Sequence, residues 1–287
     1  MNTLTAPRAP HVVRHDRPAG LAPLARLVWS QLIAALASAQ RPAPMVRAVL
    51  QTYVRYHGID LQDFHVPPGF FRSFRELHGR ALRPGARRIS ADSRAVFPSD
   101  GFVLATGEVN AGRVMQVKGM EYDLASLLGN EGGEKAIRFD GGRFINLYLP
   151  VHSYHRWCSP IDGKLLGQTH ICGDRLSLGL RSLARRRDVY VTNERLVQEM
   201  EGADFALTLV AVGGIAASHI TSRHALDSAA SVPCRKGDEL GAFWLGSTIV
   251  ILLPRAAQPV ALQPHQRILL GEPLVPQLKT VEGGQKR

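Results

Sequence analysis

The spacing of apolar residues divides the chain into a helical first part and a strand-rich remainder. Apolar residues recur at helical intervals over residues 21–39, which predicts a helix there. A second helix is predicted over 44–58, because Pro is favoured at the first helical position and Gly just past the last. A third helical stretch is predicted over 70–79. The stripes of the first two helices are formed by Leu21, Leu24, Val28, Leu32 and Leu36 and by Val46, Leu50, Tyr53 and Val54.

After about residue 90, short β-type runs alternate with turns that contain Gly or Asp. Many short strands separated by turn signals are typical of a compact β-rich domain. The predicted fold class is therefore α+β, with N-terminal helices followed by a β-rich domain. We expect a disordered arm over 1–20, a helical region over 21–90 and the β-rich domain over 91–287. The predicted strands are 101–109, 113–117, 144–149, 164–172, 189–192, 205–212, 215–220 and 248–253.

The charge balance points to an anionic partner. The 287 residues include 35 Lys and Arg against 24 Asp and Glu, a formal net charge of +11. Arg dominates these cations, and guanidinium groups bind carboxylate and phosphate through two hydrogen bonds at once. Nucleic acid and an anionic membrane surface both fit this description. No nucleic-acid-binding motif is present in the sequence, so no nucleic-acid partner is predicted.

The segment 21–39 fits a membrane surface. Arg26 and the arginines before it would let a helix lie on an anionic bilayer with its apolar side down. A core-facing helix is an equal alternative. A cleaved signal is a third, because Ala37-Ser38-Ala39 resembles a signal-peptidase site, but the apolar stretch is short and interrupted. No apolar run reaches the roughly 18–20 residues that span a bilayer.

The cysteines indicate free thiols. Cys158, Cys172 and Cys234 form neither a disulfide framework nor a CxxC pair. This usage favours a reducing compartment, and no metal site is predicted.

Four segments concentrate chemically useful residues. They are 97–101, with Asp100 in a tight turn; 148–160, with two His, one Arg and one thiol; 192–195, with Asn, Glu and Arg; and 236–250, where a Gly-Ser pair opens an apolar strand. Each has a plain structural interpretation when taken alone: a turn, a packed aromatic loop, an ion-pair turn and a turn into a core strand. Loops held by a strand scaffold are also common hosts for catalytic groups.

Taken together and in order, these segments resemble the phosphatidylserine decarboxylase family of pyruvoyl-dependent enzymes, over about residues 45–255. The order of so many short motifs makes chance agreement improbable. The matching positions are Leu245-Gly246-Ser247-Thr248, Lys236-Gly237-Asp238-Glu239-Leu240-Gly241, Asp100-Gly101, Lys118-Gly119, Tyr122, Leu127-Leu128, Tyr154-His155-Arg156, Asn193-Glu194-Arg195, and Phe74, Arg80, Leu82, Pro84, Arg87 and Ile89.

The resemblance implies a specific chemistry. Decarboxylating an amino acid leaves electrons at Cα that no ordinary side chain can accept, so a carbonyl cofactor is needed. In this family the carbonyl is a pyruvoyl group made from the chain itself. Ser247 would attack the carbonyl of Gly246, the chain would break between them, and a β chain of residues 1–246 and an α chain of residues 247–287 would result. Asp100, a His of the Tyr-His-Arg segment and Ser247 are the implied catalytic set.

The chain departs from the family pattern at one important position. The pattern carries an acid and a second His where this chain has Ser153 and Cys158. Either His155 serves both self-cleavage and decarboxylation, or Cys158 or His152 substitutes, or self-cleavage is slow or absent. An ordinary thiol, with a pKa of about 8.5, is a poor base at neutral pH. Met120 and the short 220–236 segment are further departures, and the latter bears on the substrate pocket.

The leading hypothesis is a carboxy-lyase that converts phosphatidylserine to phosphatidylethanolamine and CO2, with 91–287 as its catalytic domain. The implied partners are an anionic phospholipid membrane, the phospholipid substrate and the two chains after cleavage, and a homodimer is left open. The implied location is peripheral, on the cytoplasmic face of the inner membrane. The alternatives are a pyruvoyl decarboxylase of another, soluble substrate and an uncleaved non-enzymatic relative. A serine hydrolase is rejected because no Gly-x-Ser-x-Gly elbow is present.

Overall fold

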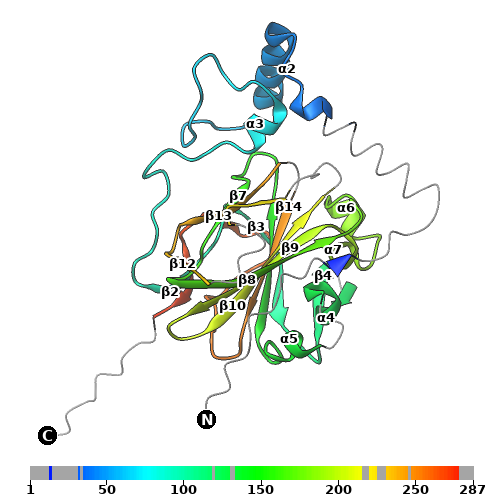
Figure 1. The fold of residues 1–287 in the computed structure, drawn as a ribbon, viewed down its shortest axis with the longest axis vertical. Helices are drawn as coiled ribbons and strands as arrows, with labels where there is room; N and C mark the ends of the chain where they lie inside the picture. The colour runs from blue at the N-terminus through cyan, green and yellow to red at the C-terminus, as the bar shows by residue number, and fades with distance from the viewer. Residues whose placement is uncertain are drawn as a thin grey trace, which may run out of the picture.

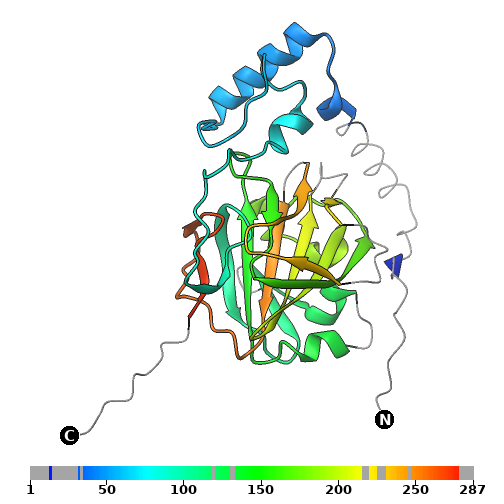
Figure 2. The same cartoon turned by 60° about the vertical axis from the view of Figure 1, so that its left-hand side comes forward.

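A computed structural model describes residues 13–14, 32, 35–117, 120–129, 133–214, 220–224, 231–244 and 247–277. Short helices come first, and most of the remaining chain forms antiparallel sheets, so the predicted α+β class is confirmed. The helical part sits at one end of the molecule, above the ends of the main-sheet strands (Figures 1 and 2). No helix within the described ranges has the length and apolar character that crossing a bilayer requires.

The helical part is built on α2 (Ala43–Tyr56) and α3 (Phe74–His78). Gly58, with a φ of +58°, follows α2 as the sequence predicts. The Ser73 hydroxyl caps α3 by accepting a hydrogen bond from the backbone of Glu76 at 3.2 Å, so this helix is shorter than the predicted 70–79. Most of the predicted helix over 21–39 lies outside the described residues, apart from Leu32 and 35–39.

The main sheet contains nine described strands, and every pairing in it is antiparallel except that of the short first strand. Central strands are paired on both sides, which satisfies their backbone hydrogen bonds. In spatial order the path is β1 (Val13–Arg14), β8 (Gly163–Cys172), β9 (Arg195–Gly202), β10 (Ala206–Gly213), β14 (Ser247–Leu253), β6 (Arg143–Leu149), β3 (Gly101–Glu108) and β15 (Arg267–Ile268), with β12 (Val232–Cys234) also paired to β8.

Smaller elements cover the main sheet. One three-stranded sheet carries the Tyr-His-Arg segment, and single helical turns close the loops. The three-stranded sheet is β11 (Ile220–Ser222), β13 (Glu239–Phe243) and β7 (Arg156–Cys158); the ribbons are β16 (Pro273–Pro276) with β2 (Ser93–Val96) and β4 (Arg113–Val117) with β5 (Met120–Asp123); the short helices are α4 (Leu124–Leu128), α5 (Glu134–Ile137), α6 (Leu180–Leu183) and α7 (Val189–Thr192).

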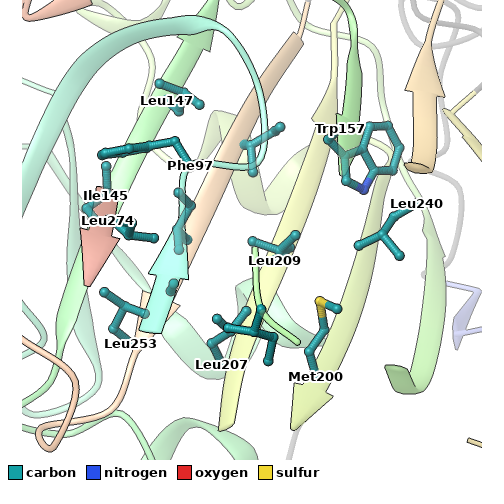
Figure 3. Close-up of a cluster of buried hydrophobic side chains, with 14 of the residues drawn as sticks. Phe97, Ile145, Leu147, Trp157, Met200, Leu207, Leu209, Leu240, Leu253 and Leu274 are labelled. Atoms are coloured by element: carbon teal, nitrogen blue, oxygen red, sulfur yellow. The ribbon is translucent and has the colours of Figure 1, made fainter. Parts of the chain in front are cut away.

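The central strand β14 explains the long apolar run in the sequence. All seven of its residues are buried, because apolar layers cover both faces of the sheet. Ile249, Ile251 and Leu253 point into one layer, which also holds Trp157. Figure 3 shows this layer between the main sheet and the strands that cover it. Val250 and Leu252 point to the other face of the sheet and pack into the second layer.

Six of the predicted strands match observed strands within about one residue: 101–109, 113–117, 144–149, 164–172, 205–212 and 248–253. The prediction for 189–192 is wrong. Asp188 adopts a φ of +58°, and the Thr192 amide donates to the Asp188 carbonyl at 2.8 Å, which closes one helical turn. The turn buries Val189 and Tyr190, so tertiary burial outweighs the β-propensity of Val-Tyr-Val-Thr.

Two sequence predictions lie mainly outside the described residues. Of the predicted strand 215–220, only Ile220 is described, and it begins β11. Of the predicted arm 1–20, only β1 is described, and it pairs in parallel with the end of β8. The domain boundaries at 20 and 90 therefore remain predictions.

Candidate active site

Ser247 opens the central strand of the main sheet. Its neighbours across the ladders are Leu149, the last residue of β6, and Gly213, the last residue of β10. Three strand ends therefore meet around this one serine. Ser247 is fully buried, and its Oγ has no hydrogen-bond partner among the described residues. A buried hydroxyl without a partner is costly, and such an atom calls for a functional explanation.

The Tyr-His-Arg segment is tied to the strand that leads to Ser247. The Phe243 amide donates to the carbonyl of His155 at 2.8 Å, and Arg156 pairs with Ala242 across β7 and β13. Leu245 and Gly246, the residues of the expected cleavage motif before Ser247, lie outside the described residues.

His155 is a fully buried, neutral imidazole. Its Nδ1 lies 2.9 Å from the carbonyl oxygen of Ser153, which can only accept, so Nδ1 carries the proton. Nε2 is then unprotonated, and it has no hydrogen-bond partner of good geometry in the described chain. Burial, and next the charge of Arg80, lower the pKa of His155 to about 3. The Leu149 backbone acts in the opposite direction and raises the pKa of His155. The ring therefore lies close to Leu149, which is the ladder partner of Ser247.

Asp100 lies beside this segment but does not hydrogen-bond to an imidazole. Its carboxylate accepts from Arg87 Nε at 3.0 Å and Nη2 at 2.6 Å, and from the amide of Leu270 at 2.9 Å. The preceding Ser99 hydroxyl donates to the carbonyl of Arg156 at 2.9 Å and to that of Tyr154 at 3.2 Å. The structure therefore brings the Asp100 turn and the Tyr-His-Arg segment together through the backbone, with Arg87 on the carboxylate.

Cys158 and His152, the other candidate bases, differ in their surroundings. Cys158 is buried in an apolar cluster with Phe64, Tyr154 and Leu270. Burial, with the charge of Glu239, raises the pKa of its thiol to about 12, so the thiol is protonated at neutral pH. His152 is exposed, and partial burial of its ring, followed by the charges of Arg267 and Arg80, lowers its pKa.

Comparison with known proteins fits this arrangement. The sequence profile described as "Phosphatidylserine decarboxylase" matches residues 74–276, which include Ser247, His155 and Asp100. The chain belongs to the phosphatidylserine decarboxylase family. This is a family of carboxy-lyases, and the resemblance inferred from the sequence is confirmed.

Curated relatives are similar over most of their length. Three of them are named phosphatidylserine decarboxylase proenzyme. The protein of Anaeromyxobacter sp. (strain K) is 36% identical over 85% of this chain and 92% of its own length. The protein of Halorhodospira halophila is 32% identical over 80% and 81%, and that of Acidovorax ebreus is 34% identical over 76% and 81%.

The Asn-Glu-Arg segment of this decarboxylase-family chain contacts β10, the strand that pairs with Ser247 on the side opposite to β6. Asn193 is buried and donates to the carbonyl of Gly213 at 2.7 Å, next to Ser247 in the ladder. The buried Arg195 donates to backbone carbonyls, including that of Leu127 at 2.7 Å. Glu194 accepts from His170 at 2.9 Å. These contacts support the structural interpretation of the segment.

The residues present fit a pyruvoyl group made from Ser247. The serine is buried at a strand terminus, a neutral imidazole lies close to its ladder partner, and each carries a polar atom with no partner in the described part of the chain. Among the residues that the structure covers, no set of three His, Cys, Asp or Glu side chains could hold a metal ion. Lys118 and Gly119, two further family positions, lie outside the described residues.

Sequence reasoning missed His78. This residue ends α3, is 1% exposed, and stacks its ring on that of His155 with centroids 5.1 Å apart and planes 13° apart. In the sequence, His78 sits in a helical stretch with no partner nearby along the chain, so it carries no signal of its own. Only the packing of α3 against the Tyr-His-Arg segment shows it.

Proposed function

We propose that this chain decarboxylates phosphatidylserine to phosphatidylethanolamine and CO2, using a pyruvoyl group formed when the chain cleaves itself between Gly246 and Ser247. The observation that carries the proposal is the buried Ser247 hydroxyl, unpartnered among the described residues, at a strand end whose ladder partner Leu149 lies close to a neutral histidine, in a chain of this family.

His155 is the base that this proposal assigns to self-cleavage. Its Nδ1–H donates to the Ser153 carbonyl, so Nε2 is the atom free to accept the Ser247 proton. The nucleophile then attacks the Gly246 carbonyl and the proton passes to the departing nitrogen of Ser247, so that an ester now joins the two residues. β-Elimination breaks the Cβ–Oγ bond, releases Gly246 as a carboxylate and leaves dehydroalanine at residue 247. Addition of water to its imine form, with loss of ammonia, gives the pyruvoyl group. Cys158 is a poor choice for this role because its thiol holds its proton at neutral pH.

The sheet would hold the two products together after the cut. The α chain would begin at Ser247 with β14, which lies between β10 and β6 and pairs with both along its length. An inner strand with partners on both sides and apolar layers on both faces leaves the sheet only if the core opens. Once formed, the pyruvoyl group would supply the electron-accepting carbonyl that amino-acid decarboxylation needs.

The supporting experiment is an intact-mass measurement on a denatured sample. We expect two fragments that meet at residues 246 and 247, with a blocked N-terminus on the smaller one, and release of CO2 from phosphatidylserine. A single full-length mass would instead support the uncleaved relative. Two fragments without phosphatidylserine turnover would support a decarboxylase of another substrate.

Asp100 is assigned a positioning role through Arg87. Asp100→Ala is expected to slow self-cleavage about tenfold and to lower Tm, because it leaves the largely buried Arg87 guanidinium without its main partner. Cleavage is followed by gel and unfolding by heat. Asp63→Ala is the matched control, since Asp63 bonds the same guanidinium from an exposed position. Cleavage of Asp100→Ala at the wild-type rate would reduce Asp100 to a turn residue.

The helical part is proposed to dock on an anionic membrane. Met45, Val49 and Tyr56 lie on one side of α2 and are exposed, the last to 84%, while Arg47 and Arg55 are also exposed on the same helix. An exposed apolar stripe with basic neighbours suits the surface of an anionic bilayer. The helix lies at the outer end of the molecule, beyond α3 (Figure 1). The proposed location is peripheral, on the cytoplasmic face of the inner membrane.

Exchanging the three α2 residues Met45, Val49 and Tyr56 for Ser is expected to lower the fraction bound to anionic phosphatidylglycerol vesicles severalfold, because apolar area and nearby charge act together. Binding is measured by sedimentation, and added salt should weaken it. Ile137→Ser, which changes an exposed apolar residue on the separate helix α5, is the control. Equal binding by the two variants would contradict docking through α2.

A further inference from the structure

The end of α3 packs against the Tyr-His-Arg segment and against the residue Trp244, which precedes Ser247. His78 stacks on His155, and the following Gly79 accepts hydrogen bonds from Arg156 at its carbonyl. A Cβ on Gly79 would lie 2.6 Å from the ring of Trp244, three residues before Ser247. A helix from the N-terminal part therefore contributes directly to the surroundings of the reacting serine.

His78 holds an unpartnered polar atom in this place. Its side chain is 1% exposed, and Nδ1 has no hydrogen-bond partner among the residues described. A phenylalanine could stack on His155 equally well without an unsatisfied nitrogen. Stability therefore does not explain a histidine here, and a ligand that satisfies Nδ1 would.

Two of the unpartnered atoms belong to one contact, because His155 Nε2 and His78 Nδ1 are on stacked rings. Ser247 Oγ is on the residue that pairs with Leu149, and the Leu149 backbone in turn raises the pKa of His155. Burial, the neighbouring His155 and Arg80 hold the pKa of His78 well below its usual range, so this imidazole is neutral. Each ring can then offer one donor or one acceptor without a charge.

We propose that His78 is a second imidazole of the active site and that its Nδ1–H hydrogen-bonds the carboxylate of the substrate's serine head group, beside His155. This inference rests on the proposed function. A neutral donor suits a carboxylate that must leave as uncharged CO2, because a cation would stabilise the charged ground state more than the transition state. His78 therefore orients the carboxylate during decarboxylation and has no part in self-cleavage.

Two substitutions distinguish the contribution of the His78 Nδ1 atom from that of the stacked ring. His78→Phe keeps a stacking ring and removes Nδ1, whereas His78→Asn removes the ring and keeps a polar group near the position of Nδ1. Leu77→Val is the matched control, because Leu77 is buried in the same helix and packs away from His155, against Leu50 and Phe71. The readouts are self-cleavage of the precursor, Tm, and kcat/KM on vesicles of phosphatidylserine in phosphatidylcholine.

For His78→Phe we expect cleavage within about threefold of wild type, an unchanged or higher Tm, and a kcat/KM lower by about tenfold or more. His78→Asn should keep a higher kcat/KM than His78→Phe despite a lower Tm. Leu77→Val should lower Tm with kcat/KM within about threefold of wild type. This order of activities is opposite to the order of stabilities, which a purely structural role cannot produce.

Wild-type kcat/KM in His78→Phe, or an activity of His78→Phe above that of His78→Asn, would overturn the inference. Wild-type protein, assayed in parallel, tests the proposed function separately. If wild type neither cleaves nor decarboxylates, the proposed function fails. If wild type does both and His78→Phe does both equally well, only the role of His78 fails.

Discussion

Ser247→Ala is expected to leave one uncut chain of 287 residues with no decarboxylase activity. Alanine has no oxygen to attack the Gly246 carbonyl, and it cannot be converted to a pyruvoyl group. The folded state should not suffer, because the change removes a buried hydroxyl that has no partner among the described residues. Intact mass and CO2 release measure the first two outcomes, and a thermal melt measures the third.

Thr248→Val is the matched control for Ser247→Ala. Thr248 is the next residue of β14, equally buried, and its change also removes a hydroxyl from the same strand. Cleavage should proceed in Thr248→Val. Two fragments from Ser247→Ala would refute the assignment of Ser247 as the nucleophile.

His155→Ala is expected to slow self-cleavage by about 100-fold or more, the usual contribution of a positioned general base. The rate in wild type should change little between pH 6 and 8, because the pKa of His155 is lowered to about 3 and Nε2 stays unprotonated throughout that range. The base is lost only as the pH falls toward that value. Precursor decay, followed by gel at several pH values, measures both effects.

Cys158→Ser is the control that separates the two candidate bases. A thiol with a pKa of about 12 contributes no base at neutral pH, so this variant should mature within about threefold of wild type. Cys158→His should then change the rate little, because His155 already accepts the proton. Normal maturation of His155→Ala would transfer the role to Cys158 or His152.

The sequence alone determined the elements whose signals are local. Gly58 after α2 and the five-residue apolar run from Ile249 to Leu253 specify a helix end and a buried strand through the chain's own periodicity and backbone freedom. The order of short motifs likewise identified the family, because each motif is contiguous. These features need no knowledge of what packs against them.

Strands with mixed composition escaped sequence analysis. β9 carries the polar residues Gln198, Glu199 and Glu201. β7 has only three residues and lies within the segment 148–160, whose sequence is typical of a loop. Both are strands because neighbours satisfy their backbones: β9 pairs with β8 and β10, and β7 pairs with β13. Conversely, Val189–Thr192 has strand propensity and forms a helical turn, because burial of Tyr190 decides the outcome.

Only the tertiary structure decided the partners and the protonation states of the site. The sequence suggested Asp100 behind a histidine, whereas the fold places Arg87 on that carboxylate and the Ser153 carbonyl on His155. It also places His78 on His155, from residues far apart in the chain. A hydrogen-bond partner, a stacked ring and a desolvated pKa depend on groups brought together by folding, so no pattern along the sequence contains them.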